Sequence, residues 1–202
     1  TAYGDSPYQP LSTFAGNEML IDIGDLISLQ LLNRGEVDEL TTLPERHVDY
    51  GALIPIKNRL LRLAAERFEE KVSEDILNGF RGFVEQNDDE WLHDYALFRI
   101  LKSKHGERPW PEWQTEFVHR DAEALARIEE QEADQIQAIK IIQYLYFRQW
   151  RAVRDYAHEH GIVLFGDMPI CIALDSSDAW ANRDLLRIDE DGRPDHVAGV
   201  PP

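Results

Sequence analysis

The sequence predicts an α/β protein, and three observations lead to this fold class. Apolar side chains repeat at helical spacing through most of residues 56–160, which is the pattern of amphipathic helices. After Gly161 the chain carries the unbroken apolar run Ile162-Val163-Leu164-Phe165, typical of a strand that is buried on both faces of a parallel sheet. A helix, a glycine and a buried strand in that order form one step of an α/β fold.

The length leaves two arrangements open. A complete barrel of alternating strands and helices needs about 250 residues, whereas this chain has 202. It is therefore expected to be either a small α+β domain or an interior part of a larger protein. The chain begins at Thr1 instead of a methionine and ends on Pro201-Pro202, which favours the second arrangement.

The N-terminal region predicts loops followed by one short helix. Residues 1–24 are rich in Gly, Pro, Asn and Asp, which are residues of turns. Asp25 is expected to cap a helix over 26–33 that ends at Gly35.

The region from 56 onwards predicts a series of helices. Leu60, Leu61 and Ala64 mark the first, and Ser73 is a suitable N-cap for the second. Asn87 followed by Glu90 resembles a capping box that opens a third helix. That helix is expected to stop near Gly106, before Pro109-Trp110-Pro111 breaks the pattern.

The C-terminal third predicts a long helix, a strand and a turn. An apolar stripe from Leu125 to Leu145 indicates one helix over about 120–160, with Gly161 in the position of a helix-terminating glycine. The strand 162–166 follows. Asp189-Glu190-Asp191-Gly192-Arg193 carries the Asp-Gly signal of a hairpin turn.

Composition excludes several classes of function. The chain carries 21 basic and 38 acidic residues, a formal net charge of −17, which repels phosphate backbones and anionic lipids. We therefore expect no nucleic-acid partner and no membrane partner, and no apolar run approaches the length of about 20 residues that spans a bilayer. The single cysteine, Cys171, permits no intrachain disulfide and indicates a reducing compartment, the cytoplasm.

No cofactor or metal site is predicted. His158-Glu159-His160 places its histidines two residues apart on a helix, so that they face different directions, and a solvated helix end is the expected role. The glycines do not form a phosphate-binding loop.

Two residues are candidates for a binding site on their own chemistry. Asp167 directly follows the predicted strand, and in barrel enzymes polar residues at that position face the active site. The alternative is a carboxylate that pairs locally in a loop. Tyr8 offers a flat ring and a hydroxyl that suit a sugar, and its alternative is burial beneath a loop.

Taken together, several ordered segments resemble the amylomaltase, or 4-α-glucanotransferase, family (glycoside hydrolase family 77). The matching segments run across the whole chain: Tyr3-Gly4-Asp5-Ser6-Pro7-Tyr8-Gln9, Phe14-Ala15-Gly16-Asn17, Val48-Asp49-Tyr50-Gly51, Asp94-Tyr95-Ala96-Leu97-Phe98, Phe147-Arg148-Gln149-Trp150, Gly166-Asp167-Met168-Pro169-Ile170, Asp175-Ser176, Asp178-Ala179-Trp180-Ala181, Asp191-Gly192-Arg193-Pro194 and Val197-Ala198-Gly199-Val200-Pro201-Pro202. Cys171 departs from the family, which usually has an aromatic residue there.

The resemblance implies part of a (β/α)₈ barrel with a large helical insertion. Residues 1–55 would be the loop segment after the second strand, with a substrate-contacting motif. Residues 56–145 would be a mostly helical inserted subdomain, and 146–202 would return to the barrel with its third strand and the following loop.

The resemblance also implies the chemistry. The family transfers α-1,4-glucan segments between maltodextrins by a retaining double displacement, in which a carboxylate nucleophile and a Glu acid/base act on the glycosidic bond. Both groups are expected downstream, so no catalytic residue is assigned here and the chain alone is expected to be inactive. Tyr8 and Asp167 would contact the sugar, with Ser6 and Tyr3 as weaker candidates. The implied ligands are maltooligosaccharides and α-1,4-glucans.

Two alternatives remain beside the transferase. One is a related α-glucan hydrolase, although the Arg187-Ile188-Asp189 motif that resembles a nucleophile in such enzymes sits at the predicted hairpin turn. The other is a non-catalytic, helical glucan-binding module that uses the aromatic residues of 91–113, a reading that weakens if Trp91 and Trp113 are buried. The oligomeric state is left open.

Overall fold

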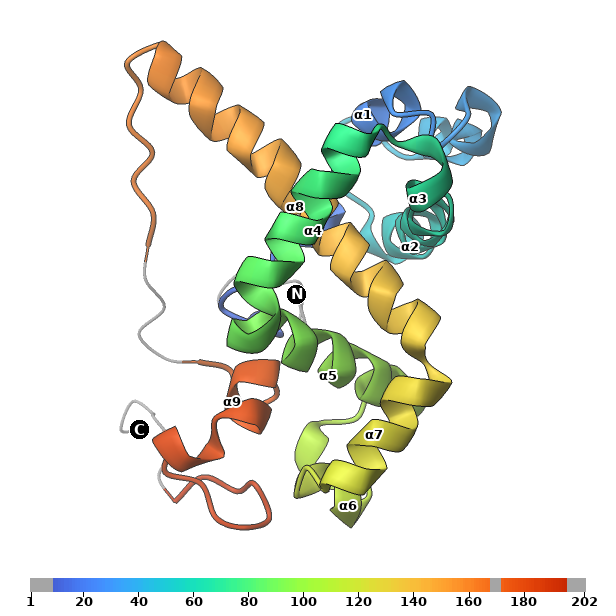
Figure 1. The fold of residues 1–202 in the computed structure, drawn as a ribbon. Coiled ribbons are helices and arrows are strands. Elements are labelled where there is room, and N and C mark those ends of the chain that lie inside the picture. Colours follow the sequence, from blue (N-terminus) through green and yellow to red (C-terminus); the bar gives the residue numbers. More distant parts are fainter. Residues whose placement is uncertain (1–8, 168–171, 196–202) are drawn as a thin grey trace. The chain divides into compact units, whose positions relative to one another are not determined.

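The computed structural model describes residues 9–167 and 172–195, and within these residues the chain is helical (Figure 1). No strand forms among them, and the one β-type pairing is an isolated antiparallel bridge between Ile188 and Pro194. The α-helices, in order, are α1 Ile23–Ser28, α2 Tyr50–Glu66, α3 Phe68–Lys71, α4 Glu74–Asn87, α5 His93–Lys104, α6 Thr115–Val118, α7 Ala122–Gln131, α8 Ala133–Glu159 and α9 Ser177–Ala181.

The chain divides into two compact units. Among the described residues, the first unit comprises 9–15, 88–136 and 172–195, and the second comprises 16–87 and 137–167. These units are defined by contacts and do not test the predicted domains. The assignment of barrel and insertion to residues 1–55, 56–145 and 146–202 stays a prediction. No described helix combines the length and the hydropathy that crossing a membrane requires.

The second unit has a core built from α2, α3, α4 and α8. Leu60, Leu61 and Ala64 of α2 are fully buried, as their spacing predicts. The rings of Phe68, Phe80 and Tyr144 meet edge to face, with centroid separations of 5.5 to 5.9 Å, the geometry that favours aromatic pairs.

The N-terminus of α1 differs from its prediction. The cap is Asp22, whose Oδ2 accepts a hydrogen bond from the backbone N–H of Asp25 at 2.8 Å. Asp25 therefore lies inside the helix, which begins earlier than expected and ends at Ser28. Gln30 adopts a positive φ of 61° directly after it, so the chain turns there and not at Gly35.

Two further helix boundaries also differ from prediction. Asn87 does not cap a helix, because it is the last residue of α4 and its side-chain amide donates to the carbonyl of Phe83 at 2.7 Å. A wide π-turn over Asp88–Leu92 then leads into α5. The helix expected over 120–160 is two helices, because Asp121 caps α7 through the N–H of Ala124 and α8 starts anew at Ala133.

Three other predicted helix boundaries and one predicted turn are confirmed. α4 begins directly after Ser73. Gly106 and Gly161 follow α5 and α8 with φ of +64° and +70°, a conformation that glycine adopts without steric cost. The turn over 189–193 is also formed, since the N–H of Asp189 donates to the carbonyl of Arg193 at 2.8 Å.

The strand predicted over 162–166 is not formed in this structure. Residues 162–167 are extended and carry no regular secondary structure, and Phe165 is completely exposed. A parallel strand obtains its hydrogen bonds and its burial from neighbouring strands, and no such neighbour lies among the described residues. The apolar pattern alone therefore does not produce a strand.

Candidate functional site

Of the four predicted glucan-contacting residues, only Asp167 lies among the described residues. Tyr3, Ser6 and Tyr8 lie outside the described residues. Asp167 is described, and it is exposed at the end of the extended segment that follows α8. The assignment of these four residues to a substrate site therefore stays a prediction.

The chain just after Tyr8 is held by the carboxylate of Asp178 in α9. Its Oδ2 accepts a hydrogen bond from the backbone N–H of Thr13 at 2.6 Å, and its Oδ1 accepts one from the Ser12 hydroxyl at 3.2 Å. The backbone N–H of Ser177 donates to the carbonyl of Leu11 at 2.8 Å. Asp178 is 9% exposed, so this carboxylate anchors the segment and is not free for a ligand.

Asp175, which precedes α9, has a structural role as well. Its carboxylate pairs with the Lys102 ammonium of α5 at 2.6 Å and accepts the backbone N–H of Trp110 at 3.3 Å. The Trp110 indole donates to the carbonyl of Leu174 at 2.7 Å. Gly192 lies against the same ring, where a Cβ atom would come within 2.3 Å of Trp110. The motif residues Asp175 and Gly192 thus serve packing of the first unit.

The aromatic residues of 91–113 are mostly committed to the interior. Trp113 is 5% exposed, and its indole donates to the carbonyl of Arg108 at 3.0 Å. Trp91 is partly buried between Phe14 and Tyr95, with ring centroids at 6.4 and 6.2 Å. Burial of Trp113 and partial burial of Trp91 weaken the hypothesis of a non-catalytic binding module.

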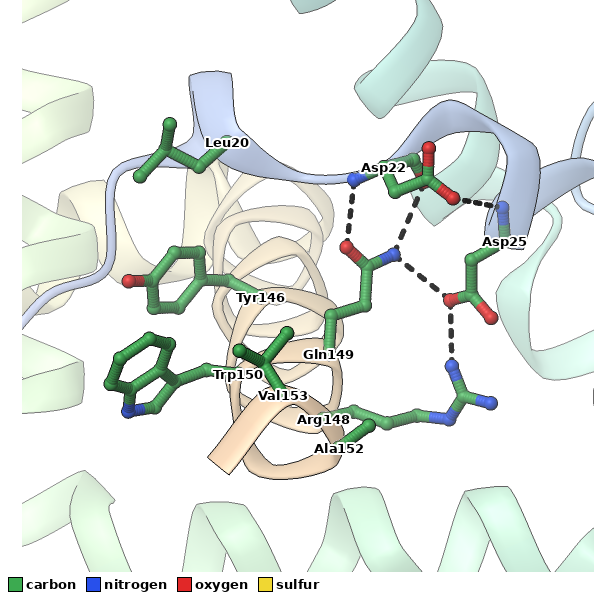
Figure 2. Close-up of a pocket in the computed structure, with 9 residues that line it drawn as sticks. All are labelled: Leu20, Asp22, Asp25, Tyr146, Arg148, Gln149, Trp150, Ala152 and Val153. Carbon is green, nitrogen blue, oxygen red and sulfur yellow. Dashed lines mark hydrogen bonds and ion pairs between the residues drawn. The ribbon is translucent and has the colours of Figure 1, made fainter. Parts of the chain in front are cut away.

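The second unit contains a pocket of about 560 Å³ between the segment 20–25 and helix α8 (Figure 2). Sequence reasoning did not predict it. It is lined by Leu20, Asp22, Asp25, Tyr146, Arg148, Gln149, Trp150, Ala152 and Val153.

One wall of the pocket is a fixed polar network around Gln149. Its Oε1 accepts the backbone N–H of Asp22 at 2.7 Å, and its Nε2 donates to the carbonyl of Asp22 at 3.2 Å and to Oδ2 of Asp25 at 2.9 Å. Arg148 donates to the same Oδ2 at 2.7 Å. Figure 2 shows these bonds joining α8 to the 22–25 segment, so the side chains of this wall are held in position before any ligand arrives.

The other wall is aromatic and apolar. Tyr146 and Trp150 lie four residues apart on α8 and therefore on one face of the helix, and Figure 2 shows both rings on the side of Leu20. Burial raises the pKa of the Tyr146 hydroxyl above its usual value. The Tyr146 ring packs on the backbone of Gly16, where a Cβ atom would lie 1.9 Å from its Cδ1.

This arrangement suits binding and not bond cleavage. The carboxylates of Asp22 and Asp25 each accept hydrogen bonds within the wall, and the pocket lacks a pair of carboxylates set free to act as acid and nucleophile. Among the described residues no group of three or more His, Cys, Asp or Glu side chains could hold a metal ion.

Comparison with known proteins assigns the family. A family model described as 4-alpha-glucanotransferase, glycoside hydrolase family 77, matches residues 1–202. The chain is 42% identical over its whole length to 39% of a 4-alpha-glucanotransferase from Thermus thermophilus, and 35% identical over its whole length to 41% of one from Clostridium butyricum.

A solved structure agrees with these relatives. The amylomaltase from Streptococcus agalactiae in complex with acarbose matches with a TM-score of 0.91 and 30% identity, over 100% of this chain and 40% of that one. The chain thus spans about 40% of the length of the proteins it matches. It belongs to the 4-alpha-glucanotransferase family, glycoside hydrolase family 77.

Proposed function

We propose that the protein that contains this chain is a 4-α-glucanotransferase, which moves segments of α-1,4-glucan from one maltodextrin to another. The observation that carries the proposal is the family match over all 202 residues, together with whole-chain identities of up to 42% to 4-alpha-glucanotransferases. The reaction is a retaining double displacement in which a sugar hydroxyl, instead of water, receives the glycosyl group.

Asp167 and Tyr8 are proposed to contact the sugar at the cleavage point, and Ser6 and Tyr3 to contact the glucan near it. Residues 162–166 are proposed to be the third strand of a (β/α)₈ barrel. Their exposure supports this, because an apolar run that ends in Phe165, 100% exposed, is suited to burial in a sheet. The nucleophile and the acid/base are not assigned to any residue of this chain.

Incubation of the protein expressed from its complete gene with maltotriose tests the proposal, with products resolved by mass. Transfer of a maltosyl unit between two maltotriose molecules yields glucose and maltopentaose, and the number of reducing ends stays constant. Maltose and glucose without longer chains would identify an α-glucan hydrolase instead. Absence of any turnover would contradict both enzymatic assignments. The single cysteine of the chain supports placing this activity in the cytoplasm.

A further inference from the structure

We propose that Asp178 is a positioning residue for the glucan-transfer reaction: it fixes residues 11–13 and through them sets the place of Tyr8 against the sugar at the cleavage point. The inference rests on the proposed function and on the sugar contact proposed for Tyr8. Asp178 itself is assigned no contact with the substrate, because its carboxylate is buried and bonds to the chain itself.

The anchor formed by Asp178 and Ser177 holds three consecutive residues. Oδ2 of Asp178 accepts the backbone N–H of Thr13 at 2.6 Å, and its Oδ1 accepts the Ser12 hydroxyl at 3.2 Å. The carbonyl of Leu11 accepts both the backbone N–H and the hydroxyl of Ser177, at 2.8 and 3.2 Å. Because hydrogen bonds are directional, these contacts fix the register of the segment as well as its place.

Helix α9, which carries the anchor, is itself held by the core of the first unit. Trp180 of this helix is fully buried, and its indole donates to the carbonyl of Phe117 at 2.8 Å. The guanidinium of Arg120 lies over the same ring, with Cζ 4.2 Å from the ring centroid. The carboxylate of Asp178 is therefore presented to the segment by a fixed support.

The link from the anchor to Tyr8 is short and stiff. Only Gln9 and Pro10 separate Tyr8 from Leu11 in the sequence. The ring of Pro10 locks its own φ at about −65°, and it restricts Gln9, the residue before it, to extended backbone conformations. Few torsions remain free along this link, so a displacement of Leu11 is passed on to Tyr8.

The chemistry of the anchor favours positioning over simple packing. A buried carboxylate loses its hydration, and its partners among the described residues, a backbone N–H and a hydroxyl, are both neutral. Apolar packing would hold the segment without this cost, but it has no directional preference. The carboxylate instead selects which backbone N–H it holds. Such precision matters for catalysis, because a misplacement of about 1 Å can lower a rate by about 100-fold.

A double-mutant cycle tests the assignment by maltotriose kinetics of the protein expressed from its complete gene. The cycle compares wild type, Tyr8→Ala, Asp178→Ala and the double variant. Asp178→Asn is the conservative variant, since its amide oxygen can still accept the N–H of Thr13. Asp121→Ala is the matched control, because Asp121 accepts the N–H of Ala124 at 2.9 Å at the start of α7, in the same unit.

Melting temperatures of all variants accompany the kinetics and show which variants are folded. If Asp178→Ala does not fold, Ser12→Ala takes its place in the cycle, because it removes only the hydroxyl that donates to Asp178 and that accepts the N–H groups of Phe14 and Ala15.

We expect kcat to fall by about 10- to 100-fold in Asp178→Ala, as displacement of a substrate contact implies, and Asp178→Asn to recover most of this loss. In the Tyr8→Ala background, Asp178→Ala should lower kcat by less than about twofold, because the ring through which it acts is already absent. Asp121→Ala should lower the melting temperature and leave kcat unchanged.

Losses of kcat that multiply in the double variant would overturn the positioning role, because Asp178 would then act independently of Tyr8. Wild-type kcat in Asp178→Ala or in Tyr8→Ala would overturn it as well, and so would an equal loss in Asp121→Ala. The two proposals fail in different ways. Turnover with multiplying losses rejects the positioning role alone, whereas absence of wild-type turnover rejects the transferase and the positioning role together.

Discussion

The ammonium group of Lys102 lies 2.6 Å from Oδ2 of Asp175, with the two side chains only 5% and 11% exposed. Lys102→Met would leave the Asp175 carboxylate buried beside the backbone N–H of Trp110 alone. Removing one partner of a buried pair costs about 3–5 kcal/mol, because the remaining charge loses its compensation. Urea denaturation of the variant should show this loss in the free energy of unfolding.

An exposed pair in the same unit is the control. Arg127 lies 3.2 Å from Glu116, with side chains 54% and 43% exposed, and solvent screens such pairs. Arg127→Met should lower the free energy of unfolding by less than about 1 kcal/mol. Similar losses in Lys102→Met and Arg127→Met would contradict a special role for the buried pair.

Two glycines of α4 should respond to alanine in opposite directions. A Cβ atom on Gly82 meets no atom within 4 Å, whereas one on Gly79 would lie 2.5 Å from the Tyr144 hydroxyl, which donates to the carbonyl of Ile76 at 3.1 Å. Gly82→Ala should raise the free energy of unfolding by about 0.5–1 kcal/mol through helix propensity. Gly79→Ala should lower it by about 1–3 kcal/mol, because the Tyr144 ring must shift.

Urea denaturation of both variants gives the two free energies of unfolding. Because each variant changes a glycine of α4 to alanine, the helix-propensity contribution is the same in both, and the difference between them reports the contact with Tyr144. If Gly79→Ala proved as stable as Gly82→Ala, the contact between Gly79 and Tyr144 would not be limiting. Tyr144→Phe in the Gly79→Ala background should recover part of the loss, since the hydroxyl is the nearest atom to the added methyl group.

Local signals predicted the helix ends well where a single residue decides the backbone. Gly106 and Gly161 both take positive φ, a conformation that other residues avoid. The same kind of reasoning was wrong at Asn87, which was predicted to cap the start of the next helix. Its side chain instead donates to the carbonyl of Phe83, so Asn87 belongs to the end of α4. It also failed between α7 and α8, where the apolar stripe runs on across Glu132 although the helix does not.

The hydrogen bonds that build the Asp178 anchor and the Gln149 network join residues far apart in the sequence, so no local sequence pattern predicts them. Asp178 holds Thr13 across 165 residues of sequence, and Gln149 holds Asp22 across 127. The motif around Asp178 drew attention through its resemblance to the family, but its hydrogen bonds to the chain after Tyr8 follow only from the structure. The strand predicted over 162–166 is absent among the described residues for a related reason, since a strand depends on its neighbours.

Acid should weaken the contact between Glu36 and Arg67. Hydrogen bonds from the Arg67 guanidinium at 2.9 and 2.8 Å, together with the backbone N–H of Asn33, lower the pKa of Glu36 from 4.5 to about 2. Because the folded-state pKa lies below the unfolded one, the carboxylate stabilises the fold fully above pH 4.5. This contribution is lost as the pH falls toward 2.

Glu36→Gln isolates that contribution. The difference between wild type and variant in the urea midpoint should be constant at neutral pH and should shrink between pH 4.5 and 2, as the wild-type carboxylate becomes protonated. Glu74→Gln, in an exposed pair with Arg81, is the matched control and should show no comparable change in this range. A difference for Glu36→Gln that stays constant down to pH 2 would contradict the lowered pKa.

Substitution of the two proposed sugar contacts should slow the transferase. Asp167→Asn keeps the size of the side chain but removes its charge, and hydrogen bonds to sugar hydroxyls that strengthen in the transition state supply several kcal/mol in retaining enzymes. We expect kcat on maltotriose to fall by about 100-fold for Asp167→Asn. Tyr8→Ala removes a stacking ring and should also lower kcat strongly.

The matched control is Asp191→Asn, an exposed carboxylate of the 189–193 turn, which should leave kcat unchanged. Melting temperatures of each variant separate lost chemistry from lost folding. Wild-type kcat in Asp167→Asn would show that this carboxylate does not touch the reacting sugar, and the site would then have to be sought among other residues.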